Sequence, residues 1–169
     1  DQFEHFTPDV IDLFKRLGDT GCCEFIGETY FHSLSFLYSQ AEFESQVEMH
    51  TQRIVDLFGH RPTVFRDTEL IYANDLARAL SRMKDKDGNG RWSGTICEGT
   101  DWHLGFRSPN YVYKPPPGDD GKDLVGRDGR PLGLLLKNYR LSDDIAFRFS
   151  NRGWAEWPLS AEKFAGWVN

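Results

Sequence analysis

The feature that most constrains the fold is the alternation of short apolar runs with longer segments of helical period. In the first half of the chain the expected helices are residues 7–18, 39–59 and 75–83, and the expected strands are residues 22–26, 62–65 and 94–97. Strands separated by helices pair in parallel, because each helix carries the chain back along the sheet before the next strand begins. The sequence therefore predicts an α/β fold with a mainly parallel sheet, open or closed, and outer helices.

The helix over residues 39–59 has the clearest boundaries. Ser39 and Glu42 have the spacing of an N-terminal capping box, and Gly59 is the residue type that commonly ends a helix. Apolar residues recur on one face between these two ends. We expect this helix to pack on the sheet.

Turn-rich segments interrupt the second half of the chain. Residues 84–92 are polar, and residues 115–131 combine a proline triplet with several glycines, a composition that excludes long regular elements. Beyond them we expect a strand over residues 132–136, a short helix capped by Ser142 that runs to Phe149, and a last helix over residues 161–168. We interpret the interruptions as excursions from a single α/β unit that spans residues 1–169.

Charge and composition exclude several classes of partner. A net charge of −6 argues against nucleic acid, because a phosphate backbone binds to a basic surface. No apolar run approaches the roughly 20 residues that cross a bilayer, so we expect no membrane partner. The cysteines, Cys22, Cys23 and Cys97, are odd in number, and adjacent cysteines rarely pair with each other. Reduced thiols in a cytoplasmic protein are the expected state.

Four loops follow the proposed strands, and parallel strands would open all of them on one rim. These loops are Glu28–His32, Asp67–Tyr72, Glu98–Asn110 and Lys137–Arg140. Carboxylates, Trp, Tyr and His together suit a carbohydrate, because aromatic faces pack on a sugar ring while polar groups bind its hydroxyls. The alternative is that these aromatic side chains only cover the edges of the core.

Glu69 lies just past the strand over residues 62–65, where α/β proteins collect catalytic groups. It could be a nucleophile, a general base, or a carboxylate held by Arg66. A retaining glycosidase needs a second carboxyl group about 5 Å away, to protonate the leaving oxygen. The candidates for it are Asp101, Glu98, Glu28 and Asp67, and for each an ion pair or a helix cap is the simpler alternative.

The sequence contains no complete pattern of calcium or zinc ligands. Asp85, Asp87, Asn89 and Gly90 match the first half of a calcium loop, but its twelfth position is Ile96 rather than an acid, so a solvated turn is expected. The five histidines have no zinc-ligand spacing, and the sequence contains neither a phosphate-binding glycine loop nor a GxSxG nucleophile motif. We expect neither a metal nor a cofactor.

Three ordered motifs, GETYFHSL, FRDTELIY and EGTDWHLGFRSPNYVY, together resemble glycoside hydrolase family 57, in particular its α-amylase-like members. The resemblance continues through LLLKNYRLSDDIAFRF to the Trp-rich tail. It implies part of a (β/α)7 barrel with parallel strands and outer helices, and cleavage of α-glucosidic bonds with retention. The matching glutamate, Glu69, would be the nucleophile, and His32 would contact the sugar.

By the same resemblance Asp101, Trp102 and His103 would line the cleft. Tyr72, in the loop after Glu69, completes the set of candidate substrate-binding residues. The substrate would be an α-1,4-glucan or maltooligosaccharide, and that chemistry requires no metal.

The sequence departs from the family pattern in three places. Asp67 stands where family members commonly carry asparagine, and residues 84–92 look like an insertion. The family's acid/base aspartate and its early histidine motif have no counterpart in these 169 residues. We therefore expect an incomplete catalytic barrel that lacks its general acid. Two alternatives stay open: a non-catalytic glucan-binding or regulatory fragment, and a metal-dependent polysaccharide deacetylase, for which no His and Asp ligand set is evident.

Overall fold

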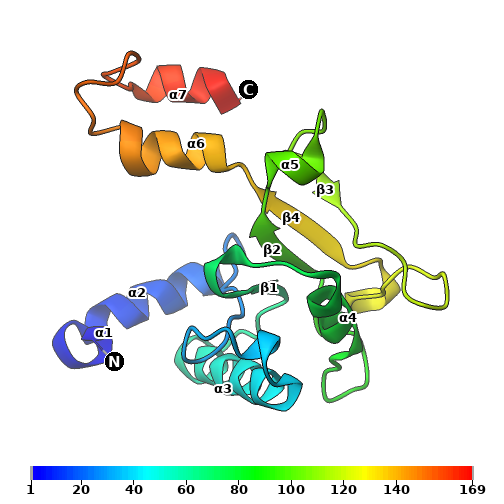
Figure 1. The fold of residues 1–169 in the computed structure, drawn as a ribbon. Coiled ribbons are helices and arrows are strands. Elements are labelled where there is room, and N and C mark those ends of the chain that lie inside the picture. The colour runs from blue at the N-terminus through cyan, green and yellow to red at the C-terminus, as the bar shows by residue number, and fades with distance from the viewer. Residues whose placement is uncertain (1, 169) are drawn as a thin grey trace.

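A computed structural model describes residues 2–168, which form a four-stranded sheet with helices around it (Figure 1). The helices are α1 Gln2–Phe6, α2 Pro8–Asp19, α3 Gln40–Phe58, α4 Asn74–Arg82, α5 Asp101–Leu104, α6 Tyr139–Asp143 and α7 Ala161–Val168. The strands are β1 Val64–Arg66, β2 Gly94–Glu98, β3 Val112–Tyr113 and β4 Gly133–Lys137. None of the helices in the described part of the chain has the length and apolarity that a membrane span requires.

The strand order is β1-β2-β4-β3, with β1, β2 and β4 mutually parallel. This confirms the predicted parallel sheet, and it brings the loops after these three strands to one edge. The short strand β3 pairs antiparallel with β4 inside a stretch predicted to be a loop. Two residues are too few to show a period-2 pattern, so β3 could not be predicted from the sequence.

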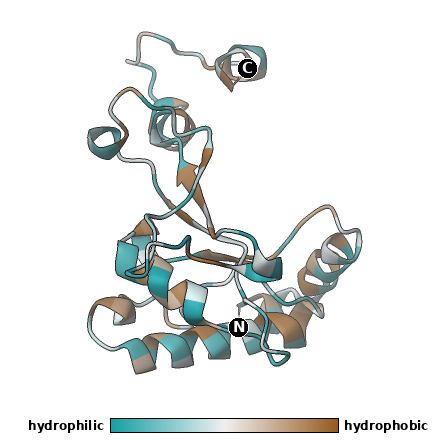
Figure 2. Ribbon diagram, turned by 90° about the vertical axis from the view of Figure 1, so that its right-hand side faces the viewer, coloured by the Kyte–Doolittle hydropathy of each residue, from teal (hydrophilic) through white to brown (hydrophobic). Residues whose placement is uncertain are grey.

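The core lies between the sheet and helices α3 and α4. Phe65 of β1 is fully buried, and its ring centroid lies 5.6 Å from that of Phe43 on α3 and 5.3 Å from that of Trp92. The other buried members of this cluster are Val47, Leu76, Ala77, Leu80 and Leu132. Figure 2 shows apolar strands beside helices that alternate between polar and apolar segments, as expected for helices with one face on the core.

Helix α3 has the predicted ends. The Ser39 hydroxyl accepts a hydrogen bond from the Glu42 backbone N–H at 3.3 Å, and Gly59 ends the helix with a left-handed φ of 78°. Glycine suits this end because it adopts positive φ without a side-chain clash. Helix α2 packs beside α3 through Phe14, whose ring contacts Phe58 at the end of α3.

The predicted strand over residues 22–26 is wrong. Only Gly27 bridges to β1, through backbone hydrogen bonds with Val64 and Arg66. One residue earlier in the register, the Val64 N–H that a longer strand would use is donated to the carboxylate of Glu24, which also accepts the Thr63 N–H. A side chain therefore occupies the donors that a further ladder would need.

The helix predicted to begin at Ser142 begins earlier. Asn138 is its N-cap, because the Asn138 side-chain oxygen accepts a hydrogen bond from the Leu141 N–H at 3.2 Å. Helix α6 continues into a π-helical turn over Asp144–Arg148, and α7 matches its predicted range. None of these three C-terminal elements contains a buried residue, and Figure 1 shows them extending away from the sheet.

Candidate active site

The chain leaves β1 through a strained turn that carries Glu69. Glu69 and Leu70 have φ angles of 56° and 59°, in the left-handed region that non-glycine residues rarely adopt. Each such residue costs on the order of 1–3 kcal/mol, and such strain concentrates at functional sites. Backbone hydrogen bonds from Leu70 to Asp67 and from Ile71 to Thr68 hold the turn closed. The Glu69 side chain therefore projects into solvent at the carboxyl end of the strand, with 72% of its surface exposed.

His32 comes from the loop before α3 and also has a left-handed backbone, with φ of 51°. Its Nε2 atom lies 3.3 Å from Oε1 of Glu69, and its Nδ1 atom makes a close contact with Oε1 of Glu28. The hydrogen bond to Glu28, followed by the one to Glu69, raises the pKa of His32. A histidine between two carboxylates is favoured in its charged form, in which both ring nitrogens donate.

A buried polar network fixes the two loops to each other. The hydroxyls of Thr29 and Thr68, one residue beyond Glu28 and one before Glu69, lie 3.2 Å apart and are both buried. On the other side, the Ser33 hydroxyl donates to the side-chain oxygen of Gln46 on α3 at 2.7 Å. Buried hydroxyls with satisfied partners specify one arrangement of the chain. The position of His32 relative to Glu69 is therefore set by the packed core.

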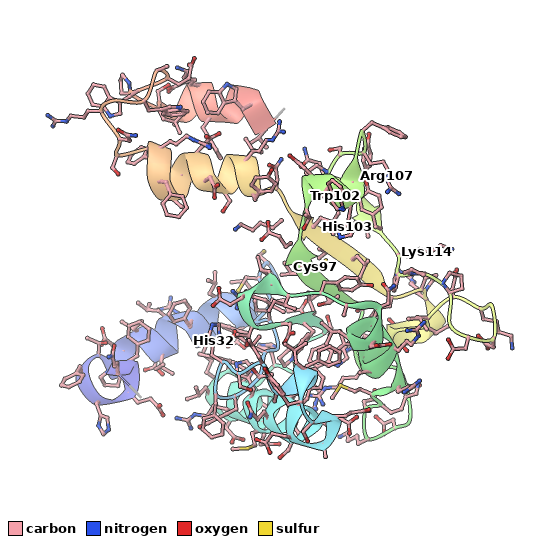
Figure 3. All side chains as sticks on the ribbon, viewed as in Figure 1. His32, Cys97, Trp102, His103, Arg107 and Lys114 are labelled. Carbon is pink, nitrogen blue, oxygen red and sulfur yellow. The ribbon has the colours of Figure 1, made fainter. Side chains whose placement is uncertain are left out.

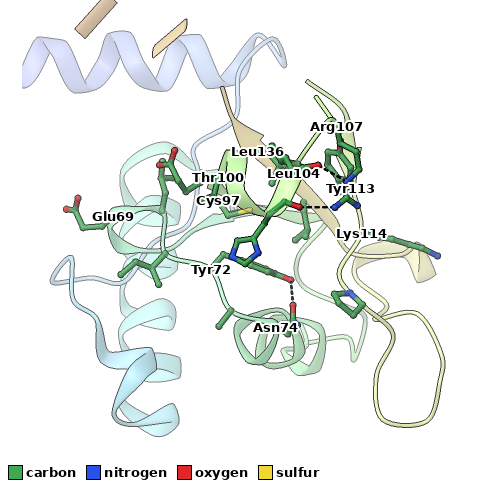
Figure 4. A pocket seen from close by; sticks show the side chains of 17 residues that line it. Glu69, Tyr72, Asn74, Cys97, Thr100, Leu104, Arg107, Tyr113, Lys114 and Leu136 are labelled. Carbon is green, nitrogen blue, oxygen red and sulfur yellow. Dashed lines mark hydrogen bonds between the residues drawn. The ribbon is translucent and has the colours of Figure 1, made fainter. Parts of the chain in front are cut away.

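Glu69 lines the wall of a cavity of about 740 Å³, which Figure 4 shows from close by. This cavity, here named the rim cavity, opens at the carboxyl ends of β1 and β2 and reaches the loop after α5. A volume of this size accommodates a small ligand such as a short oligosaccharide. Its lining residues are Glu69, Leu70, Ile71, Tyr72, Ala73, Asn74, Cys97, Glu98, Thr100, His103, Leu104, Arg107, Tyr113, Lys114, Pro116, Leu134 and Leu136.

Two titratable residues form neutral walls of the rim cavity. Burial raises the pKa of Tyr72 to about 12 and that of Cys97 to about 11, because a low-dielectric environment disfavours their charged forms. The Tyr72 hydroxyl donates to the side-chain oxygen of Asn74 at 3.2 Å. Both side chains are uncharged at neutral pH, so they offer apolar surface and hydrogen-bonding groups rather than charge.

The six candidate residues from the sequence do not all meet. Glu69, Tyr72 and His103 line the rim cavity. His32 does not line it but lies within hydrogen-bonding distance of Glu69. Asp101 instead accepts hydrogen bonds from Tyr139 and Arg140, at 2.7 and 3.0 Å, and lines a separate cavity of about 350 Å³. Trp102 is 87% exposed and lies on α5, well away from His32 (Figure 3).

Of the four candidates for a second carboxyl group, Glu98 alone lines the rim cavity with Glu69. Its carboxylate lies 3.9 Å from Nζ of Lys137. Asp67 is 1% exposed, and neither of its oxygens has a hydrogen-bond partner among the described residues. Burial raises the pKa of Asp67 to about 6. Glu28 is occupied by His32 and by Arg66, whose guanidinium donates at 3.2 Å.

Several residues that line the rim cavity were not among the candidates from the sequence. Asn74 begins α4, Cys97 lies near the end of β2, and Arg107 and Lys114 come from the segment around β3. Two sequence features could have indicated them: Cys97 ends a predicted strand, and Arg107 lies in a loop predicted to open on the rim. Arg107 donates to the carbonyl oxygens of Leu104 and His103, which ties the loop after α5 back to that helix (Figure 4).

The segment that resembled half a calcium loop is a turn stabilised by its own side chain. The Asp85 carboxylate accepts the backbone N–H groups of Asp87 and Asn89, both at 2.9 Å, and Lys84 bridges to Gly90 across the turn. Among residues 2–168, no group of three or more His, Cys, Asp or Glu side chains is arranged to hold a metal ion.

The chain is similar to known proteins in both sequence and fold. The family model described as Glycosyl hydrolase family 57 matches residues 1–169. A protein named "Putative alpha-amylase" from Methanocaldococcus jannaschii is 42% identical over 169 residues, which cover 99% of this chain and 32% of that protein. The chain thus spans about a third of the length of this curated relative.

The crystal structure of a 4-α-glucanotransferase from Thermococcus litoralis resembles the fold, with a TM-score of 0.61 at 16% sequence identity. The match covers 86% of this chain and 21% of the glucanotransferase chain. This likeness confirms the predicted fold class, an α/β arrangement with parallel strands and outer helices that forms part of a (β/α)7 barrel.

Proposed function

Because this chain belongs to glycoside hydrolase family 57, we propose that the protein is a retaining, α-amylase-like enzyme that acts on α-1,4-glucans, with Glu69 as its nucleophile. The observation that carries this proposal is the geometry of Glu69. A strained turn at the carboxyl end of a parallel strand presents its carboxylate to the rim cavity, within hydrogen-bonding distance of His32. The names of the two relatives, an α-amylase and a glucanotransferase, support an α-glucan or maltooligosaccharide as substrate.

The reaction would proceed in two steps. An oxygen of Glu69 attacks the anomeric carbon, and the bond to the leaving oxygen breaks as that oxygen takes a proton from a general acid. Water or a second sugar hydroxyl then attacks the glycosyl–enzyme ester and frees the Glu69 carboxylate. Tyr72 and His103 would bind the sugar inside the rim cavity, and His32 would contact both the sugar and Glu69.

We also propose that residues 1–169 are an incomplete catalytic barrel, in which the general acid comes from elsewhere. The resemblance assigns that role to an aspartate in a motif that these 169 residues do not contain. The exposed area supports the proposal, because the described chain exposes 11036 Å², whereas a compact protein of its mass exposes about 8,500 Å². The incomplete-barrel proposal also agrees with the match to the curated relative, which covers only 32% of that protein.

The test is turnover of a soluble maltooligosaccharide by Glu69→Gln in the full-length protein. We expect kcat to fall by about 10⁴-fold or more, as for other lost nucleophiles. Glu44→Gln, the same chemical change on α3 at a residue that does not line the rim cavity, is the matched control and keeps full activity. Turnover by Glu69→Gln near the starting level would refute the assignment.

Azide provides a second, independent readout. In Glu69→Ala the missing carboxylate leaves room for a small anion, which attacks the anomeric carbon directly. We expect azide to restore turnover and to yield a glycosyl azide of inverted anomeric configuration, detected by NMR of the product. Sugar binding by calorimetry with no turnover in the full-length wild-type protein would instead support the glucan-binding alternative.

The cellular location is also a proposal. Cys22, Cys23 and Cys97 are all free thiols, and Cys22 is exposed. Exposed thiols persist in a reducing compartment, so we propose a cytoplasmic protein. Thiol titration of the protein purified without reductant would test it, and a disulfide in that sample would contradict it.

A further inference from the structure

We propose that Glu28 is a positioning residue that holds the His32 ring, in its charged form, against the carboxylate of Glu69. The inference deepens the proposed function and rests on it, because it assigns a role to a carboxylate next to the proposed nucleophile. Glu28 does not line the rim cavity, so it would act on the reaction through His32.

The imidazole ring of His32 lies between two carboxylates. Nδ1 contacts Glu28, four residues earlier in the same loop, and Nε2 faces Glu69, which is 37 residues away in the sequence. A neutral imidazole has a single N–H and can donate to one of these carboxylates only. The observed geometry therefore requires an imidazolium if both hydrogen bonds are to form.

Glu28 is itself held from two directions. Arg66, the last residue of β1, donates to the same oxygen that contacts His32, at 3.2 Å. The Glu28 backbone N–H donates to Nδ1 of His50 on α3 at 3.3 Å. Burial lowers the pKa of His50, which keeps that ring neutral and able to accept. The side chain of Glu28 is also only 20% exposed, whereas that of Glu69 is 72% exposed.

The charged groups around His32 act in opposite directions. Glu28 and Glu69 raise the pKa of His32, whereas the Arg66 cation lowers it by a smaller effect. Asp67, although close in sequence to Glu69, is buried and contacts neither ring nitrogen. The hydrogen bond to Glu28 is the leading cause of the increase, so we expect removal of the Glu28 carboxylate to lower the pKa of His32.

The consequence concerns the nucleophile. An N–H donor at 3.3 Å fixes the rotamer of an otherwise exposed side chain, 72% of whose surface faces solvent. A positioned nucleophile attacks without first losing its rotational freedom, so kcat benefits more than KM. Glu28 would restrict the Glu69 side chain indirectly, by holding the His32 ring that donates to it.

The experiment measures the His32 titration by two-dimensional NMR of the full-length protein, in wild type and in Glu28→Gln. His32→Gln identifies the His32 cross-peak by its loss. Glutamine keeps the size and the acceptor of Glu28 but removes its charge. We expect the His32 titration midpoint to fall by about one unit or more, and Glu28→Asp to restore part of that decrease. Glu44→Gln is the matched control and leaves the titration unchanged.

Activity gives the second readout. Above both midpoints the imidazolium fraction falls about tenfold for each unit of pKa lost. We therefore expect Glu28→Gln to lose kcat at pH 7.5, to recover most of it toward pH 5.5, and to keep its KM. Equal loss at every pH would indicate a structural role only and overturn the proposal.

The two proposals fail separately. If Glu69→Gln is inactive while Glu28→Gln keeps the wild-type titration and pH profile, the role of Glu28 is wrong and the proposed function stands. If Glu69→Gln retains activity, the proposed function is wrong, and the NMR titration still decides whether Glu28 controls the charge of His32. A midpoint unchanged in Glu28→Gln overturns the inference in either case.

Discussion

The central part of the chain and its C-terminal part differ in how their apolar residues are used. In the centre, Phe43, Phe65 and Trp92 are completely buried between the sheet and helices α3 and α4. In the C-terminal part, Phe147 in the π-helical turn and Phe149 just after it are 69% and 56% exposed. Large aromatic side chains contribute free energy of folding only when water is removed from them.

This difference explains where the candidate site lies. Glu69 and the loop of His32 are anchored to the central core, through Phe65 of β1 and Gln46 of α3. Helix α6 is joined to α5 by hydrogen bonds from Tyr139 and Arg140 to Asp101. A strained turn persists only where its surroundings resist relaxation, and the central core provides such surroundings.

Among variants that compare the central core with the exposed parts of the chain, we expect the largest loss of stability at Phe65. Phe65→Ala leaves a cavity under β1 and should lower the free energy of unfolding by about 3–5 kcal/mol. Phe106→Ala, at a fully exposed position, is the control and should change it by less than about 0.5 kcal/mol. Urea unfolding followed by circular dichroism measures both. Equal effects would show that the centre is no better packed than the surface.

Burial of the Asp67 carboxylate in the packed central part of the chain lowers the stability of the folded protein when that group is charged. Its pKa of about 6 in the folded state lies above the ordinary 3.8, so the folded protein binds more protons than the unfolded chain between these values. The contribution of Asp67 to stability is therefore greatest below about pH 4 and is lost as the pH rises to about 6, by up to about 3 kcal/mol.

Asp67→Asn removes this titration and should raise the melting temperature at pH 7.5 while leaving it nearly unchanged at pH 4. Scanning calorimetry at both pH values measures the two differences. The same gain at pH 4 would show that charge burial is not the cause. Because Asp67 precedes the strained turn, a stabilised variant with unaltered kcat would also show that the turn does not depend on this carboxyl group.

The smallest effect is expected at Phe147. In the 169-residue chain, Phe147→Ala should change the free energy of unfolding by less than about 0.5 kcal/mol, because the side chain is mostly exposed. In a full-length protein whose further segments cover this face, we expect a cost of about 1.5–3 kcal/mol. The two urea titrations compare these values directly, and identical small costs would contradict the incomplete-barrel proposal.

Much of the fold could be predicted because its signals are local. The capping pair Ser39 and Glu42, with Gly59 at the other end, determined α3 within one stretch of chain. The apolar runs that became β1, β2 and β4 are separated by helices or long connections, which led to the parallel order that the structure confirms. The prediction failed at residues 22–26, where the carboxylate of Glu24 competes for the backbone donors of β1.

The site was only partly predictable. That Glu69 follows a strand could be inferred from its neighbours, but its left-handed φ could not, because this conformation is imposed by the surrounding packing. Asp101 and Trp102 are adjacent to His103 in the sequence, yet only His103 lines the rim cavity. Successive residues on a helix point in different directions, so a short motif does not place all of its members in one cavity.

The sequence by itself determined the α/β class, the parallel strands, the family and the place of Glu69 at the end of β1, because each depends on residue types in short or ordered patterns. Only the tertiary structure decided that Nε2 of His32 lies next to Glu69, 37 residues away in the sequence, and that Nδ1 of the same ring contacts Glu28. Contacts between distant polar side chains depend on how the loops pack on α3 and β1. No local sequence pattern predicts how these loops pack.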